Sequence, residues 1–131
     1  MKKISTVLII IFIFISCGCA RTVKDLKADP SGSYSFSIKL NYEKVYRIST
    51  QYLEDNALAS SIKSRIYHQK KEAIVYNIHA PSNPLTRNIY LACEMKAISD
   101  NETSVDIYYH IATWKSEALS LKNEILSHGY E

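Results

Sequence analysis

The chain has 131 residues, a length that supports one domain rather than two. Its 47% of hydrophobic and 22% of charged residues are typical of a globular protein and exclude a largely disordered one. The formal net charge of +3 falls to +1 without Lys2 and Lys3, since 14 of the 16 basic residues then face 13 acidic residues. So small an excess excludes the basic surface of a nucleic-acid-binding protein.

The N-terminal segment has the order of a secretory signal peptide. A short positive head, Met1-Lys2-Lys3, precedes an almost wholly apolar run over residues 4–15, and small residues follow at 16–20. The apolar run of about 12 residues is shorter than the roughly 20 that a transmembrane helix needs. We therefore expect a cleavable signal peptide over residues 1–16 rather than a permanent transmembrane anchor.

Two cysteines stand at the end of this segment, in the stretch FISCGCAR at residues 14–21. The stretch resembles the lipobox of bacterial lipoproteins, in which an apolar residue three positions before a cysteine and a small residue directly before it mark that cysteine for diacylation. Phe14 in the apolar position favours Cys17 as the lipid-bearing residue. Gly18 in the small position favours Cys19. We expect Cys17, with Cys19 as the alternative.

The resemblance also implies a location. In such lipoproteins of Gram-negative bacteria, an aspartate after the lipid-bearing cysteine retains the protein in the inner membrane, whereas this chain has Gly18 or Ala20 there. The implied location is the outer membrane, with the domain on its periplasmic side and two or more acyl chains giving stable attachment. The stretch YSFSIKLNYEKVYRI at 34–48, with a late strand ending near Trp114, is similar to small proteobacterial periplasmic lipoproteins of uncharacterised function.

Residues 17–32 are expected to provide the lipid attachment and a tether. The stretch RTVKDLKADPSGS at 21–33 has mixed charge, no apolar period and the breaker Pro30-Ser31-Gly32. Residues 33–131 are then a single periplasmic domain.

Hydrophobic periods predict the elements of this domain. Asn41 is expected to cap the first helix, Thr113 to cap the second, and Gly129 to end it. On the hairpin, Ile74, Tyr76 and Ile78 are expected to share one face. The predicted elements, in chain order, are a strand at 33–40, a helix at 42–58, hairpin strands at 61–68 and 72–80, strands at 88–99 and 105–111, and a helix at 113–129.

The element order β-α-β-β-β-β-α predicts an α+β fold. Hairpin-connected strands indicate a mainly antiparallel five-stranded sheet, and helices at its start and end indicate two layers. The topology matches that of helix-grip and TBP-like half-domains, a comparison that implies no function. Pairing the first strand with the last gives the strand order 1-5-4-3-2.

The sequence contains no pattern typical of an enzyme, a metal site or a cofactor site. The alternation of its strand places Cys93 in the core, between Leu91 and Met95. With glycines only at 18, 32 and 129, no glycine-rich phosphate loop is possible. Glu94 and Asp106 are expected to face one another on adjacent strands as surface groups. The four histidines, interpreted as scattered surface residues, are His68, His79, His110 and His128.

A tyrosine-rich surface is the candidate contact site. Alternation sends Tyr90 and Tyr108 to the sheet face that the helices leave uncovered, where Tyr67, Val75 and His79 are expected to join them. Tyrosine is enriched in the anchors of protein interfaces. We therefore predict Tyr67, Tyr90 and Tyr108 as a contact surface for an envelope protein or a second copy of the chain.

These patterns favour a non-catalytic lipoprotein that acts through protein contacts in the cell envelope. Its expected partners are the membrane, through the N-terminal lipid, and a protein at the sheet face, but no nucleic acid. The alternative is a module that binds a small ligand or lipid in a groove between the sheet and the second helix.

Overall fold

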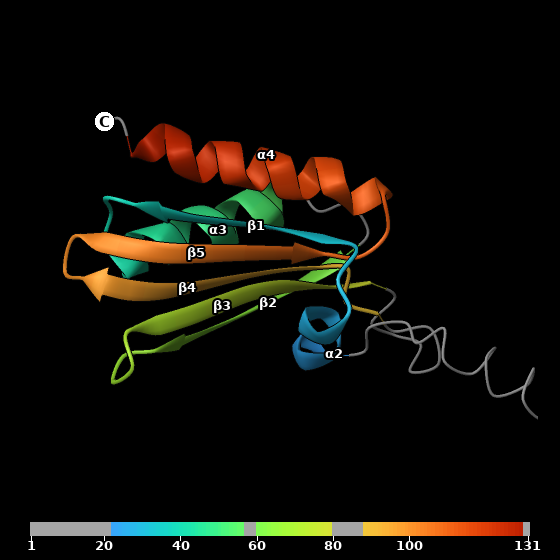
Figure 1. The fold of residues 1–131 in the computed structure, drawn as a ribbon, viewed down its shortest axis with the longest axis horizontal. Coiled ribbons are helices and arrows are strands. Elements are labelled where there is room, and N and C mark those ends of the chain that lie inside the picture. The colour runs from blue at the N-terminus through green and yellow to red at the C-terminus, as the bar shows by residue number, and fades with distance from the viewer. Residues whose placement is uncertain (1–21, 57–59, 80–87, 130–131) are drawn as a thin grey trace, which may run out of the picture.

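A computed structural model describes residues 22–56, 60–79 and 88–129, which form the predicted α+β fold (Figure 1). The expected signal peptide at 1–16, the lipidation candidates Cys17 and Cys19, the expected end of the first helix at 57–58 and residue 80 of the hairpin lie outside these ranges. The elements, in chain order, are α2 (Val23–Ala28), β1 (Gly32–Ile38), α3 (Tyr42–Asn56), β2 (Ser60–Tyr67), β3 (Glu72–His79), β4 (Leu91–Ser99), β5 (Glu102–Tyr109) and α4 (Thr113–His128).

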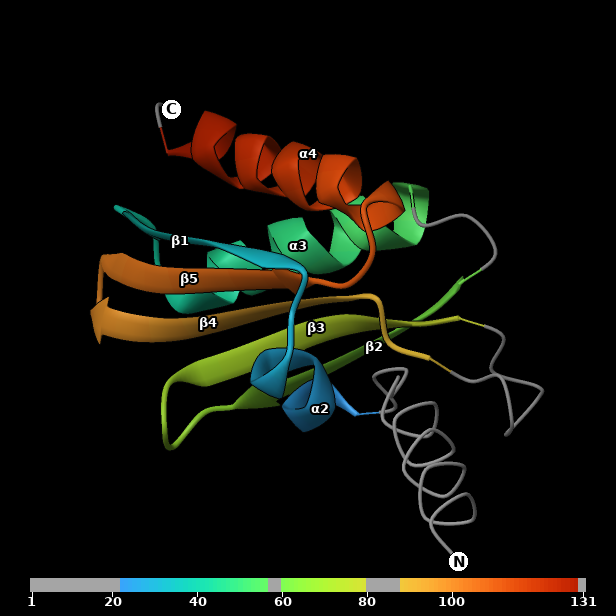
Figure 2. The ribbon, with the colours of Figure 1, turned by 45° about the vertical axis from the view of Figure 1, so that its right-hand side comes forward.

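The five strands form one antiparallel sheet in the order β1-β5-β4-β3-β2, which confirms the predicted order. Helices α3 and α4 lie side by side on one face of the sheet, and α2 lies on the other (Figures 1 and 2). We call these the helix face and the open face. The two-layer prediction therefore holds for α3 and α4, and α2 adds a partial third layer.

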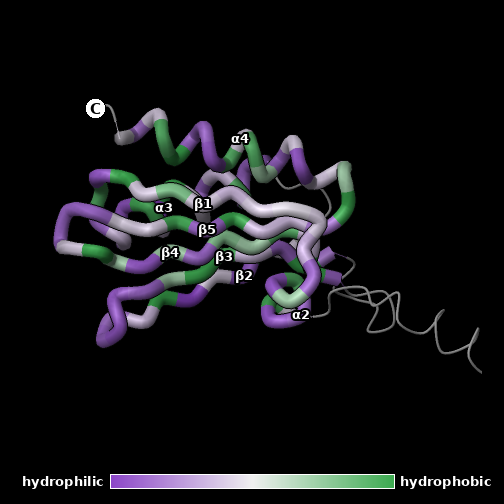
Figure 3. The backbone as a smooth tube through the Cα atoms, in the orientation of Figure 1, coloured by the Kyte–Doolittle hydropathy of each residue, from purple (hydrophilic) through white to green (hydrophobic). Residues whose placement is uncertain are grey.

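The main core fills the space between the sheet and helices α3 and α4. On α4, Ala118, Leu121 and Ile125 lie on one stripe and are fully buried. They pack with alternate residues of the central strands, and apolar and polar segments alternate along these strands in Figure 3. The strand residues of this core are Ile38, Ala73, Val75, Leu91, Cys93, Met95, Val105, Ile107 and Tyr109.

Helix α3 begins as the sequence predicts. The Oδ1 atom of Asn41 accepts a hydrogen bond from the backbone N–H of Glu43 at 2.9 Å, and its amide donates to the carbonyl of Asp100 at 3.0 Å. Asn41 thus satisfies a helix N–H that has no partner within the helix, and it also ties the helix to the β4–β5 turn.

Helix α4 begins differently from the prediction. The N-cap residue is Ala112, whose backbone is already helical at φ −62° and ψ −29°, and it makes no side-chain cap. The prediction of Thr113 as the cap is wrong, because the chain changes direction one residue before Ala112, at Ile111 with φ 62°. The helix ends at Gly129, as predicted, but without a left-handed cap. A Cβ atom there would lie 2.8 Å from Cδ1 of Ile38, so glycine permits close packing against β1.

Ile74, Tyr76 and Ile78 are alternate residues of the regular strand β3 and share one face, as predicted, but that face is the open face. Ala73, Val75 and Asn77 point to the helix face, whereas Ile74 and Tyr76 point to the open face. The outward placement of Val75 is wrong, because Val75 is fully buried in the main core. Strand β3 is apolar on both faces, and alternation alone does not assign such a strand.

Helix α2 corrects the interpretation of the tether expected over residues 17–32 for its described part, which begins at Thr22. Thr22 Oγ1 accepts from the N–H of Asp25, and Asp25 Oδ2 accepts from the N–H of Thr22, both at 3.1 Å, forming a capping box. Leu26 is fully buried against Ile89 and Ala92 on the open face. The folded unit therefore includes α2, ahead of the expected start at residue 33.

Candidate functional site

Three rows of side chains cross the open face, because paired residues on neighbouring antiparallel strands point to the same side. We call them the outer, middle and covered rows, in order of approach to α2. Read from β2 to β1, the outer row is Tyr67, Glu72, Lys96, Ser104 and Ser37; the middle row is Arg65, Ile74, Glu94, Asp106 and Ser35; the covered row is Lys63, Tyr76, Ala92, Tyr108 and Ser33.

The covered row is apolar in its central part and lies under α2. Leu26 packs with Ala92, and Tyr76 and Tyr108 pack against the same cluster. The ammonium group of Lys27 lies 5.8 Å from the centre of the Tyr108 ring. Burial is the main cause that raises the pKa of Tyr108, with the carboxylate of Asp106 adding to it.

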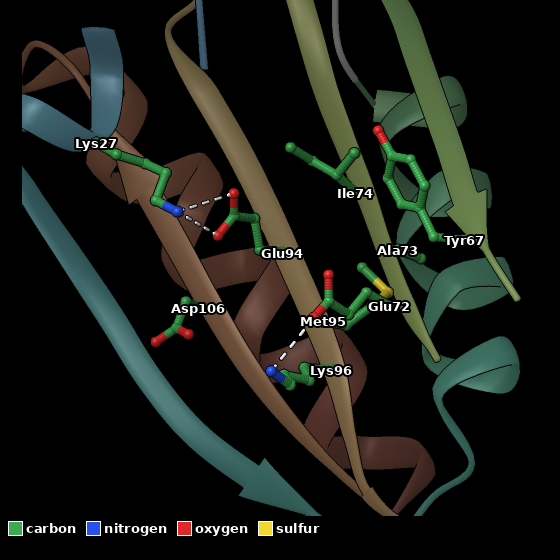
Figure 4. Close-up of a pocket in the computed structure, with 9 residues that line it drawn as sticks. All are labelled: Lys27, Tyr67, Glu72, Ala73, Ile74, Glu94, Met95, Lys96 and Asp106. Carbon is green, nitrogen blue, oxygen red and sulfur yellow. Dashed lines mark hydrogen bonds and ion pairs between the residues drawn. The ribbon is translucent and has the colours of Figure 1, made fainter. Parts of the chain in front are cut away.

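The outer and middle rows border a groove of about 370 Å³ that is open to solvent (Figure 4). Lys27 reaches into it from α2, and Tyr67 lies on the opposite side, at the end of β2. We call it the open-face groove, and its lining residues are Lys27, Tyr67, Glu72, Ala73, Ile74, Glu94, Met95, Lys96 and Asp106.

Ion pairs fix the charged side chains of the groove. Lys27 Nζ contacts both carboxylate oxygens of Glu94, at 2.9 and 3.2 Å, and Lys96 Nζ lies 3.3 Å from Glu72 Oε1. The hydrogen bond from Lys27 to Glu94 is the largest cause that raises the pKa of Lys27. Because three carboxylates face two ammonium groups, the lining carries a net charge of −1.

Asp106 completes the middle row. Its Cα position is paired with that of Glu94, which confirms that the two carboxylates lie on adjacent strands. Asp106 Oδ1 accepts a hydrogen bond from Ser35 Oγ at 2.6 Å. The groove thus presents alternating charges beside the apolar surface of Ile74 and the ring of Tyr67. Such a lining suits a polar, charge-bearing segment of another protein.

The three tyrosines predicted as a contact surface are not brought together. Tyr67 is 40% exposed at the groove, and Tyr108 lies in the covered row. Tyr90 is on the helix face, where its ring stacks on Trp114 of α4 with 5.9 Å between centroids and 17° between planes. The prediction of a common surface for Tyr67, Tyr90 and Tyr108 is therefore wrong.

An interruption of β4 explains the position of Tyr90. The predicted strand at 88–99 begins only at Leu91, and Asn77 Oδ1 accepts hydrogen bonds from the N–H groups of both Tyr90 and Leu91, at 3.1 and 2.8 Å. In a regular strand, consecutive N–H groups point to opposite sides, whereas these two share one acceptor. The regular alternation of side chains between the two faces therefore starts only after Tyr90. Ile89 accordingly lies with Leu26, and Leu91 lies in the main core.

Cys93 is a core residue, as predicted. Its side chain is fully buried, and burial raises the pKa of the thiol to about 12. The hydroxyl of Ser49 lies 3.9 Å from its sulfur. A buried thiol that stays protonated is a poor nucleophile.

The histidines occupy separate places. His68 lies 3.6 Å from Glu43, His128 lies 3.2 Å from Glu124, His110 lies 3.5 Å from Ser31, and the His79 ring contacts that of Tyr90. Among the described residues, no group of three or more His, Cys, Asp or Glu side chains could hold a metal ion.

The alternative ligand site was expected between the sheet and the second helix. Ala118, Leu121 and Ile125 of α4 fill that space and are fully buried. The space between the sheet and α4 is therefore filled by side chains, whereas the open-face groove, on the other side of the sheet, is open to solvent.

Lys27 is the groove residue that the tether interpretation missed. A signal for it was present, since Thr22 and Asp25 fit the spacing of a capping box and Leu26 follows directly.

None of the described helices has the length and apolar character to cross a membrane. No protein-family model matches the chain, and comparison with curated proteins gives no matching relative.

Proposed function

We propose that this protein is a lipoprotein anchored in the outer membrane, and that its periplasmic domain acts without catalysis, by binding another envelope protein at the open-face groove. One observation carries the proposal. A groove of paired charges lies directly beside α2, and α2 begins a few residues after the lipobox-like segment.

The short chain between lipid and domain sets the location of the groove. Thr22 stands five positions after Cys17, and an extended chain spans at most about 3.6 Å per residue. A lipid on Cys17 therefore keeps Thr22 within about 18 Å of the attachment point. With α2 held so near the bilayer, the groove faces partners at the membrane surface more readily than partners deep in the periplasm.

The lining of the groove defines the partner's chemistry. Lys27 and Glu94 are already paired, so a partner must bring its own donors and acceptors to charges that are partly satisfied. Such contacts contribute specificity more than affinity. Tyr67 and Ile74 supply the apolar area that a contact of useful strength requires.

Lipid attachment can be tested by metabolic labelling. Labelled fatty acid should enter the unsubstituted chain and the Cys19→Ser variant but not the Cys17→Ser variant. Label in Cys17→Ser alone would move the attachment to Cys19. Absence of label from all three chains would refute the anchor.

Partner binding can be tested by site-specific photo-crosslinking in intact cells. A photoreactive residue at Tyr67, in the groove, should give a dominant adduct with one envelope protein. The matched control is the same residue at Gln51, which is exposed on α3. Equal adducts at both positions, or none at Tyr67, would contradict the proposal. A small molecule retained in native mass spectrometry would favour the alternative of a ligand-binding module.

A further inference from the structure

The two edges of the sheet differ in how they are protected. Among the described strands, β1 and β2 have a neighbour on one side only. Strand β2 exposes Lys63 and Arg65, and such charges discourage pairing with another strand. Strand β1, with the sequence GSYSFSI, contains no charged residue and no proline, and Figure 3 shows most of it in pale tones. The edge at β1 is therefore open to a further strand.

The sequence of β1 reads nearly the same in both directions about Ser35. In an antiparallel pair centred there, Ser33 lies opposite Ser37 of the second copy, and Tyr34 lies opposite Phe36. Serines then meet on the open face, and aromatic rings meet on the helix face. Aromatic cross-strand pairs are among the stabilising ones, and a two-fold axis demands this self-complementarity.

Helix α4 is placed to join the same contact. It contacts both β1 and β5, and it runs along β1 in Figures 1 and 2. The helix axis of α4, above the boundary between β1 and β5, lies about one strand spacing, ~4.8 Å, from a two-fold axis placed at the outer edge of β1. Two copies of α4 would then lie about 9–10 Å apart, which is an ordinary distance for packed helices.

The flank of α4 beside β1 carries apolar residues. Lys122 Nζ lies 5.2 Å from the ring centre of Tyr34 and 6.0 Å from that of Phe36, and Leu126 borders Ser37. Leu119 precedes Lys122 by one turn on this flank and is 41% exposed. The two-fold axis brings Leu119 towards Leu126 of the second copy. Two Lys122 ammonium groups also approach each other, a repulsion that salt screens.

We propose that the free edge of β1 pairs antiparallel with the same edge of a second copy of this chain, about a two-fold axis at Ser35, so that two five-stranded sheets become one. The dimer goes beyond the proposed function and does not depend on the lipid anchor. An anchor would favour the dimer by raising the local concentration of copies.

Cysteine cross-linking of the full-length chain tests the pairing and its register. Ser35→Cys should form a disulfide-linked dimer on mild oxidation, because residues opposite each other in an antiparallel pair have Cα atoms within disulfide range. Ser33→Cys alone should stay at the background that the chain's own cysteines give, since it lies opposite Ser37. The double variant with Ser33→Cys and Ser37→Cys should cross-link again. Equal cross-linking of Ser33→Cys and Ser35→Cys, or none of Ser35→Cys, would overturn the proposal.

A charge at the two-fold axis provides the second test. Ser35→Lys places like charges opposite each other and should weaken dimerisation at least about tenfold in Kd. Light scattering of the purified full-length chain in detergent measures the mass, and circular dichroism verifies folding. Lys63→Ser at the β2 edge is the matched control and should leave the dimer unchanged. A monomeric unsubstituted chain at tens of micromolar, or a fully dimeric Ser35→Lys chain, would refute the pairing.

Discussion

The helix face and the open face belong to the same strands but are stabilised differently. On the helix face, two long helices cover the sheet, and side chains such as Leu121 and Val105 are fully buried. On the open face, the six-residue helix α2 covers one row of side chains, and ion pairs such as that between Lys27 and Glu94 occupy the next. Stability should therefore reside on the helix face, which leaves the open face free to vary with a partner.

The largest effect should come from breaking the helix face. Leu121→Ala removes a fully buried side chain and leaves a cavity, so the free energy of unfolding should fall by about 3 kcal/mol or more. Urea denaturation measures the loss. Leu119→Ala on the same helix, measured at a protein concentration that keeps the chain monomeric, is the matched control, because Leu119 is 41% exposed and should lose less than about 0.5 kcal/mol. Similar losses for the two leucines would contradict this view of the core.

Breaking the apolar contact of the open face should have a smaller and more local effect. Leu26→Ala should cost about 2 kcal/mol where α2 meets the sheet. Because α2 has only six residues, it depends on this contact to remain helical. Hydrogen exchange should show lost protection in α2, with α3 and α4 unchanged. Uniform loss of protection would show instead that the two faces unfold as one unit.

Cys93 tests how tightly the helix face is packed. Cys93→Ala should lower the free energy of unfolding by about 1–2 kcal/mol. Burial raises the pKa of the thiol from its ordinary value of 9.0 to about 12, so the unfolded chain loses the proton first as the pH rises. The unfolded state then binds fewer protons, and Cys93 should reduce stability between pH 9 and 12 by at most about 1.4 kcal/mol per pH unit.

The pH effect has its own control. Cys93→Ala should show a shallower decline of stability above pH 9 than the unsubstituted chain, because the lysines and tyrosines titrate in both. Denaturation at several pH values gives the two slopes. Identical slopes, or rapid alkylation of Cys93 in the folded protein, would show that the thiol is accessible.

The smallest effect should come from the ion pair of the open-face groove. Lys27→Met keeps the apolar stem and removes the charge, and the lysine side chain is 42% exposed, so the loss should be about 0.5 kcal/mol or less. Combining it with Glu94→Gln in a double-mutant cycle isolates the pair. A coupling energy well above 1 kcal/mol would assign the open face a larger share of stability than we infer.

The sequence by itself determined the elements with one clear apolar period. Alternation in β5 and the stripe of α4 each indicate a single buried side, and Asn41 marks the start of α3 through its side-chain acceptor. The order of these elements, with hairpin-length connections, was sufficient to predict the antiparallel sheet and the strand order 1-5-4-3-2. Burial of Cys93 followed from the same alternation.

Only the tertiary structure decided which face the ambiguous residues occupy. Strand β3 is apolar on both sides, so the contact of Tyr76 with the cluster around Leu26, and not its sequence, assigns its faces. Tyr90 turned to the helix face because Asn77 bonds two consecutive N–H groups, a long-range contact that no local period encodes. Helix α2, and with it Lys27 in the groove, exists because Leu26 finds a surface to cover, since six residues are too few to hold a helix alone.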